Sequence, residues 1–168
     1  TIDEMEPTAT VYGQLFLAWV SNDTILCQTF NGTSWNPAIN PEPVLFPRAP
    51  SLAVHEDHLY LAYEAESNIY IQAFNGSTWT TGHELIDPQP WPHDPSICSY
   101  SGSSLLYLAY VSQDQIYYQT YDGENWSTPI FIIPEFNNAL ALSLIITAST
   151  LAILITRKTT QKTRRKYV

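Results

Sequence analysis

The chain has 168 residues, of which 45% are hydrophobic and 13% are aromatic, and its formal net charge is −9. All 16 acidic residues lie at or before Glu135, and six of the seven Lys and Arg residues follow Ile155, which leaves Arg48 as the one exception. A region as acidic as residues 1–135 repels polyanions, which excludes nucleic acid as its partner.

A repeated unit fills the first 133 residues. A run of Leu, aromatic, Leu, Ala and aromatic residues occurs three times, at Leu15–Trp19, Leu59–Tyr63 and Leu106–Tyr110. Each run is followed by an aromatic residue, an Asn-Gly or Asp-Gly pair and a tryptophan, which is Trp35, Trp79 or Trp126. Both landmarks are spaced by 44 and then 47 residues, a period typical of propellers and solenoids.

Four short strands are expected in each unit. A proline (Pro7, Pro50 or Pro95) opens the first strand, and the Leu-rich run forms the second. That run is almost continuously apolar, which predicts that both of its faces are covered. The third strand ends in the Asn-Gly or Asp-Gly pair, which predicts a tight hairpin turn there. The tryptophan then begins the outermost strand, which finishes at Leu85-Ile86 in the second unit and at Ile130–Ile133 in the third.

The sequence therefore predicts an all-β fold of three four-stranded antiparallel repeats, at about 7–46, 50–92 and 95–133. With Gly-x-x-Trp closing the third hairpin, the unit resembles the blades of fucose-binding lectins and of sialidase-like propellers. The resemblance implies a β-propeller. In the lectin family an arginine, a glutamate and a tryptophan hold the sugar between blades. Arg48 is the only arginine before residue 157, so repeated sites of that type cannot be built.

The sialidase side of the resemblance implies an arginine triad and a Ser-x-Asp-x-Gly-x-x-Trp box. This chain has neither, so we expect no enzyme, except as a fragment whose catalytic residues lie in other blades. Three blades do not close a propeller, which typically has four to eight. We expect either further blades upstream or a second copy of the chain to complete it.

A membrane-spanning helix is predicted at 139–156. The run Ala139–Ile155 carries no charge and is followed by the basic segment 157–168. Cations directly after an apolar run place that end in the cytoplasm, and thus the repeats outside. A buried core helix is the alternative for this run.

A short motif precedes this helix. Pro134, Glu135 and Phe136, within the linker 134–138, stand before an apolar helix and a basic C-terminus. This order resembles the PEF-CTERM sorting signal of archaeal surface proteins. The resemblance implies processing by an archaeosortase-like membrane enzyme that cuts near the motif. The alternative is a plain membrane anchor whose Pro134 only ends the last strand.

Export also fits four Asn-x-Ser/Thr acceptors for glycosylation, at Asn22, Asn31, Asn75 and Asn125. Cys27 and Cys98 lie in different repeats, and an oxidising exterior would permit a disulfide between them. Their strand assignments place them apart, however, which favours two buried thiols.

Candidate metal ligands are few. His55, Glu56, Asp57 and His58 gather imidazoles and carboxylates suited to zinc, but a polar turn is expected at this position anyway. Glu64 and Glu66 together with Asp57 form a candidate calcium set. Neither set predicts a resident cofactor. Trp91, between two prolines, is a candidate for stacking on a sugar.

These features together predict an exported, membrane-anchored cell-surface β-propeller that acts as a binding or structural module. Its roles would be adhesion, a surface layer or a platform for protein contacts, with surface proteins or glycans as partners. The alternatives are a carbohydrate-binding lectin and a fragment of a propeller enzyme such as a glycosidase.

Overall fold

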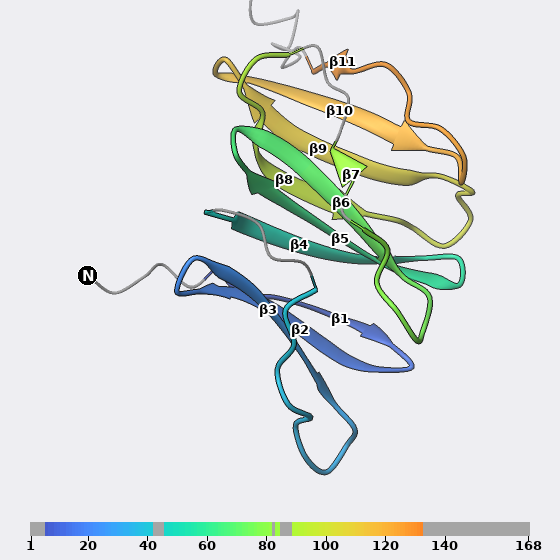
Figure 1. Cartoon of the computed structure of the whole chain (residues 1–168). Coiled ribbons are helices and arrows are strands. Elements are labelled where there is room, and N and C mark those ends of the chain that lie inside the picture. Colours follow the sequence, from blue (N-terminus) through green and yellow to red (C-terminus); the bar gives the residue numbers. More distant parts are fainter. Residues whose placement is uncertain (1–5, 42–45, 82, 85–88, 133–168) are drawn as a thin grey trace, which may run out of the picture. The chain divides into compact units, whose positions relative to one another are not determined.

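The computed structural model describes residues 6–41, 46–81, 83–84 and 89–132, which form three antiparallel sheets (Figure 1). Sheet 1 contains β1 (Thr8–Tyr12), β2 (Gln14–Ser21) and β3 (Thr24–Phe30). Sheet 2 contains β4 (Arg48–His55), β5 (His58–Ala65), β6 (Asn68–Phe74) and β7 (His83–Glu84). Sheet 3 contains β8 (His93–Cys98), β9 (Leu106–Ser112), β10 (Gln115–Tyr121) and β11 (Ile130–Phe131).

The all-β prediction is confirmed for these residues, and each repeat corresponds to one sheet. Sheets 2 and 3 have the four expected strands, but sheet 1 has three within the described residues, so the prediction of a fourth strand there was wrong. An isolated bridge between Cys27 and Ile39 stands in its place. None of the described segments forms a helix long and apolar enough to cross a membrane. The predicted helix at 139–156, the motif at Pro134–Phe136 and the basic tail lie outside the described residues.

Prolines mark a distortion near the start of two first strands. Pro50 lies in β4 and Pro95 in β8, each within a shift of register against the second strand of its sheet. The preceding residues, Ala49 and Asp94, have φ of 45° and 50°. Proline has no N–H for the sheet ladder, so a bulge is a place where a strand accepts it.

The tight hairpins are not at the Asn-Gly pairs, and that prediction was wrong. The two-residue turns with positive φ at both positions join the second and third strands, at Asn22-Asp23, Glu66-Ser67 and Gln113-Asp114. Asn22, Asp23 and Asp114 are of the residue types that tolerate the left-handed region that this turn type requires, whereas Glu66, Ser67 and Gln113 adopt it at a cost.

At the Asn-Gly pairs the side chain of the first residue organises a wider turn. The Asn75 Oδ1 accepts hydrogen bonds from the backbone N–H of Ser77 and of Thr78, both at 3.0 Å. The turn brings Trp79 back to form an isolated bridge with Phe74. The expected outermost strands follow several residues later, as the short β7 and β11.

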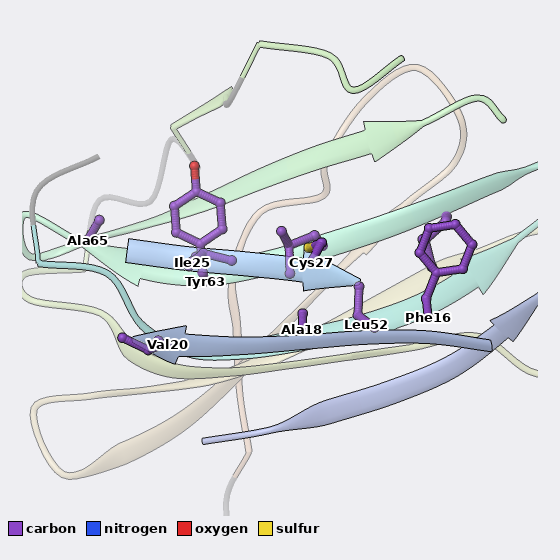
Figure 2. Packing of buried hydrophobic residues seen from close by; sticks show 10 residues of the cluster. Phe16, Ala18, Val20, Ile25, Cys27, Leu52, Tyr63 and Ala65 are labelled. Atoms are coloured by element: carbon purple, nitrogen blue, oxygen red, sulfur yellow. The ribbon is translucent and has the colours of Figure 1, made fainter. Parts of the chain in front are cut away.

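Two hydrophobic clusters fill the spaces between successive sheets. Between sheets 1 and 2, residues of β2 and β3 such as Phe16 and Cys27 pack against Leu52, Leu61 and Tyr63 (Figure 2). Between sheets 2 and 3 the buried residues are Ala53, Ala62, Ile69, Ile71, Ile97, Leu106, Leu108, Tyr110 and Tyr117. Both faces of sheet 2 are therefore covered, as the run Leu59–Tyr63 predicted.

The first strands of the three sheets lie side by side, with β4 in contact with both β1 and β8 (Figure 1). A hydroxyl group links each pair. The Thr8 Oγ1 accepts a hydrogen bond from the Leu52 N–H at 3.4 Å, and the Ser51 Oγ accepts one from the Ile97 N–H at 3.0 Å. Because both hydroxyl residues directly follow the first-strand proline, the repeat sets the contact between sheets as well as the sheets themselves.

Candidate functional site

A pocket of about 510 Å³ lies between sheets 2 and 3, and we call it the second Trp pocket. Aromatic rings form one side of it. The rings of Tyr60 and Tyr121 are 6.2 Å apart and tilted, and Tyr121 stacks on Trp126 at 5.1 Å. The polar residues of its lining are His58, Asn75, Thr80 and Glu124.

The turn after β10 fixes Trp126 in this wall. The Asp122 carboxylate accepts hydrogen bonds from the backbone N–H of Glu124 at 2.9 Å and of Asn125 at 2.8 Å. The same bonds hold the pKa of Asp122 below its ordinary value. The Tyr121 hydroxyl donates to the Gly123 carbonyl at 2.7 Å, and Trp126 forms a bridge with Tyr121. The aromatic wall is thus ordered before any ligand arrives.

Tyr60 contributes the hydroxyl of this wall. Partial burial raises the pKa of the Tyr60 phenol, and the neighbouring Tyr121 and Glu56 raise it further. The group therefore remains a neutral hydrogen-bonding O–H at physiological pH. In the part of the chain that the structure describes, no Lys or Arg lines this pocket, which combines aromatic surface with polar groups and one carboxylate.

An equivalent pocket of about 380 Å³ lies between sheets 1 and 2, and we call it the first Trp pocket. Phe16 stands where the second Trp pocket has Tyr60, and Phe74 packs on Trp79 at 5.2 Å. Burial raises the pKa of the Cys27 thiol in its lining to about 12, so this group stays protonated. Lacking the Tyr60 hydroxyl, this pocket is the more apolar of the two.

A third pocket, of about 420 Å³, lies at the other end of sheet 2, and we call it the Arg48 pocket. Arg48 on β4 is the cross-strand partner of Glu64 on β5. Trp91, just before β8, lines the pocket with 71% of its surface exposed and a φ of 55°. Trp91 is thus accessible for the stacking on a sugar expected from the sequence.

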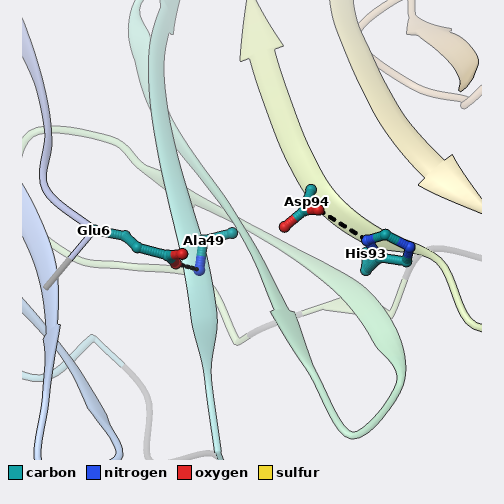
Figure 3. A network of polar contacts seen from close by, with 4 residues as sticks. All are labelled: Glu6, Ala49, His93 and Asp94. Atoms are coloured by element: carbon teal, nitrogen blue, oxygen red, sulfur yellow. Dashed lines mark hydrogen bonds and ion pairs between the residues drawn. The ribbon is translucent and has the colours of Figure 1, made fainter. Parts of the chain in front are cut away.

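Carboxylates outnumber cations in the Arg48 pocket. The Glu6 Oε2 accepts a hydrogen bond from the Ala49 N–H at 2.5 Å, and His93 Nδ1 contacts Asp94 Oδ2 at 2.9 Å (Figure 3). Glu6, Glu64 and Asp94 line this pocket together with Arg48. Arg48, Glu64 and Trp91 thus line one pocket. The sequence had indicated only that a site of arginine, glutamate and tryptophan could not occur in every repeat.

The zinc candidates lie on the β4–β5 hairpin. His55 ends β4 and is 4% exposed, whereas Glu56 and Asp57 are exposed in the turn and His58 begins β5. Among the residues that the structure describes, no three His, Cys, Asp or Glu side chains group closely enough to hold a metal ion. His58 instead lines the second Trp pocket.

Two further expectations were wrong. Asp57 precedes β5, whereas Glu64 and Glu66 lie at its far end, so the candidate calcium set does not come together. Cys27 is buried as expected, but Cys98 is exposed, and neither thiol forms a disulfide. The four glycosylation acceptors Asn22, Asn31, Asn75 and Asn125 are all exposed.

Comparisons with known proteins support the fold. No protein-family model and no curated protein matches the sequence. Among solved structures, the chain is similar to the Aleuria aurantia lectin, a β-propeller solved as its N224Q mutant in complex with Fucalpha1-6GlcNAc. The TM-score is 0.58 and the sequence identity is 14%, over 79% of this chain. This chain spans about half of the lectin, 47% of its length, and the likeness shows a β-propeller-type fold.

Proposed function

We propose that this chain is a binding module that holds a neutral carbohydrate in the second Trp pocket. The observation that carries the proposal is the aromatic wall of Tyr60, Tyr121 and Trp126 beside the polar side chains of His58 and Glu124. We propose binding and not catalysis, because the aromatic wall provides a surface on which a ligand can pack.

Sugars suit this combination of surfaces. The C–H face of a pyranose ring is apolar and packs against an aromatic ring, while its hydroxyl groups need hydrogen-bond partners. Trp126 offers the ring, and His58 and Glu124 offer acceptors and donors at the rim. The phenol of Tyr60 adds a neutral donor within the wall.

Charge favours a neutral sugar over an acidic one. Within the described part of the chain, the lining contains Glu124 but no Lys or Arg that could pair with the carboxylate of a sialic or uronic acid. Such a ligand would lose hydration without gaining an opposite charge. The acidic surroundings add to this repulsion.

The neighbouring solved structure supports the carbohydrate class, since that lectin is described in complex with Fucalpha1-6GlcNAc. The arginine expected from the lectin resemblance is not part of the second Trp pocket, and Arg48 lies at the other end of sheet 2. The sugar that this chain binds would therefore be held by stacking and neutral hydrogen bonds.

Calorimetric titration of the 168-residue chain tests this proposal, with Fucalpha1-6GlcNAc and a panel of neutral and acidic monosaccharides as probes. We expect neutral sugars to bind, and Tyr60→Phe and Trp126→Phe to weaken binding by roughly fivefold or more, about the effect of one lost hydrogen bond or stacking contact. Trp91→Ala, which changes only the Arg48 pocket, is the matched control. Loss of binding in Trp91→Ala with normal binding in both other variants would move the site to the Arg48 pocket.

We also propose that the module is exported and anchored at the cell surface by the segment after Ile133, with the sorting motif Pro134–Phe136 cut during maturation. The apolar run and the basic tail support this topology, and the exposed Asn-x-Ser/Thr sites fit glycosylation outside. Mass analysis of C-terminal peptides from the native envelope tests the processing. Recovery of residues 163–168 in the mature protein would contradict cleavage and leave a plain membrane anchor.

A further inference from the structure

The two terminal sheets each expose a face that sheet 2 keeps covered. On the β10 side of sheet 3, Ile116 is 50% exposed, whereas the equivalent Ile69 of sheet 2 is 0% exposed. Cys98 on β8 is exposed, whereas the equivalent Ala53 is 5% exposed. In sheet 2 these positions are covered by sheet 3. Within the residues that the structure describes, sheet 3 therefore presents an uncovered copy of the surface through which sheet 2 contacts sheet 3.

Sheet 1 presents the complementary surface. Leu61 and Leu108 are 0% exposed because each packs on the preceding sheet, but the equivalent Leu17 of sheet 1 is only half-buried. The same holds at the tryptophans. Trp79 and Trp126 pack against the clusters, whereas Trp35 is 45% exposed.

The first strands of sheets 1 and 3 each carry one further position equivalent to those that make the hydroxyl contacts. Thr8 accepts the N–H of Leu52, and Ser51 accepts that of Ile97. Ser96 occupies the same place in sheet 3, directly after its proline, and is exposed. Ala9 occupies the place of Leu52 and Ile97 in sheet 1, and is likewise exposed.

We propose that sheet 3 of one copy docks on sheet 1 of a second copy, and that the reciprocal contact closes a six-sheet propeller from two chains. The contact would repeat those already present between sheets 1 and 2 and between sheets 2 and 3. Six sheets lie within the usual range for propellers. The match to 47% of the propeller lectin's length agrees with half a ring per chain.

Closure would also complete a third Trp pocket at each contact. Tyr107 and Thr120 of sheet 3 stand where the second Trp pocket has Tyr60 and Ala73. The other half would come from Phe30 and Trp35 of the second copy, whose rings pack at 5.2 Å. That this pocket takes a sugar rests on the proposed function, whereas the docking itself rests on the sheet faces alone.

Native mass spectrometry of the detergent-solubilised 168-residue chain, over a series of protein concentrations, measures the number of chains directly. We expect a complex of twice the 19.0 kDa chain mass. A single chain at every concentration would overturn the proposal and leave these faces to other blades, either upstream in the same protein or in another polypeptide. Higher species growing in steps of one chain would overturn closure, since an unclosed contact of this kind produces filaments.

Charged variants identify the faces. Ile116→Lys on sheet 3 and Leu17→Lys on sheet 1 should each give single chains, because a lysine would be buried in each contact without a partner. Circular dichroism checks that both variants fold. Gln113→Lys is the matched control, since it adds the same charge to sheet 3 at an exposed hairpin tip, and it should remain a dimer.

Mixing the two variants separates this arrangement from a symmetric one. One contact of the mixed pair joins an unmodified sheet 3 to an unmodified sheet 1, so mixing should restore a complex of two different chains. If Leu17→Lys alone still formed dimers, sheet 3 would be pairing with another sheet 3, and the proposal would be wrong. The mass readout needs no sugar, so a dimer that binds none would remove the proposed function and keep the closure.

Discussion

Sheets 2 and 3 have nearly the same framework but different surroundings. Ile69 and Ile116 are the same residue at the same position of the third strand, yet one is 0% and the other 50% exposed. The difference arises because sheet 3 covers Ile69, while nothing within the described residues covers Ile116 equally. The repeated sequence thus specifies the sheet and the apolar residues on its faces. How much those residues stabilise the fold depends on whether an adjacent sheet covers them.

The largest effect expected from this difference concerns those two isoleucines. Ile69→Ala should lower the free energy of unfolding by about 2–5 kcal/mol, whereas Ile116→Ala should lower it by less than about 1 kcal/mol in dilute protein. Urea unfolding of both variants, at a concentration where the chain is single, measures the two values. Equal losses would mean that sheet 3 is covered as fully as sheet 2.

A smaller effect is expected at the bulges of the two first strands. Ala49 has a φ of 45°, which costs an L-residue about 1–2 kcal/mol, so Ala49→Gly should stabilise the chain by roughly 0.5–1 kcal/mol after the flexibility of glycine is counted. Asp94 has a φ of 50°, but Asp tolerates this region better. Asp94→Gly should therefore gain less, and thermal unfolding compares the two. A larger gain at Asp94 would place the greater backbone strain in sheet 3.

The smallest effect concerns the turns that carry the tryptophans. Asp122 in sheet 3 occupies the position of Asn75 in sheet 2, and hydrogen bonds from the Asn125 and Glu124 N–H groups lower the pKa of its carboxyl from the ordinary value. A lowered folded pKa means that its contribution to stability is present above the unfolded pKa and is lost as pH falls through the folded pKa.

We therefore expect the backbone N–H signals of Glu124 and Asn125 to shift in an acid titration followed by NMR, with a midpoint below the ordinary pKa of an Asp carboxyl. Those of Ser77 and Thr78, which bond to Asn75, should not titrate. Asp122→Asn is the matched control and should abolish the shift. A midpoint at or above the ordinary pKa of an Asp carboxyl would show that the carboxylate is not held by these N–H groups.

The repeat itself allowed most of the framework to be predicted from sequence. The run Leu59–Tyr63 predicted a strand covered on both faces, and all three Leu-rich runs became second strands. The turns were less predictable, because an Asn-Gly pair can form either a two-residue hairpin turn or a wider turn that the Asn side chain caps. In this chain the Asn side chain caps a wider turn, and ordinary polar pairs such as Glu66-Ser67 form the tight hairpins.

The sites were harder to predict than the framework, because each pocket draws residues from two sheets. The second Trp pocket joins Tyr60 to Trp126, and the Arg48 pocket joins Glu64 to Trp91. No local pattern encodes such pairs. The available signals were compositional: Arg48 is the one arginine before residue 157, and Trp91 lies between two prolines. The exposure of Ile116 could not be predicted either, since its local pattern matches that of Ile69.

Alkylation of Cys98 tests most directly the claim that sheet 3 is an uncovered copy of sheet 2. Cys98 lies on the open face of sheet 3, whereas Cys27 is buried with a thiol pKa of about 12 and serves as an unreactive internal reference. Our account predicts that N-ethylmaleimide modifies Cys98 quickly in dilute protein and slowly at concentrations where two chains associate. Modification of Cys98 at one rate across those concentrations, in protein shown to be dimeric, would contradict docking through this face.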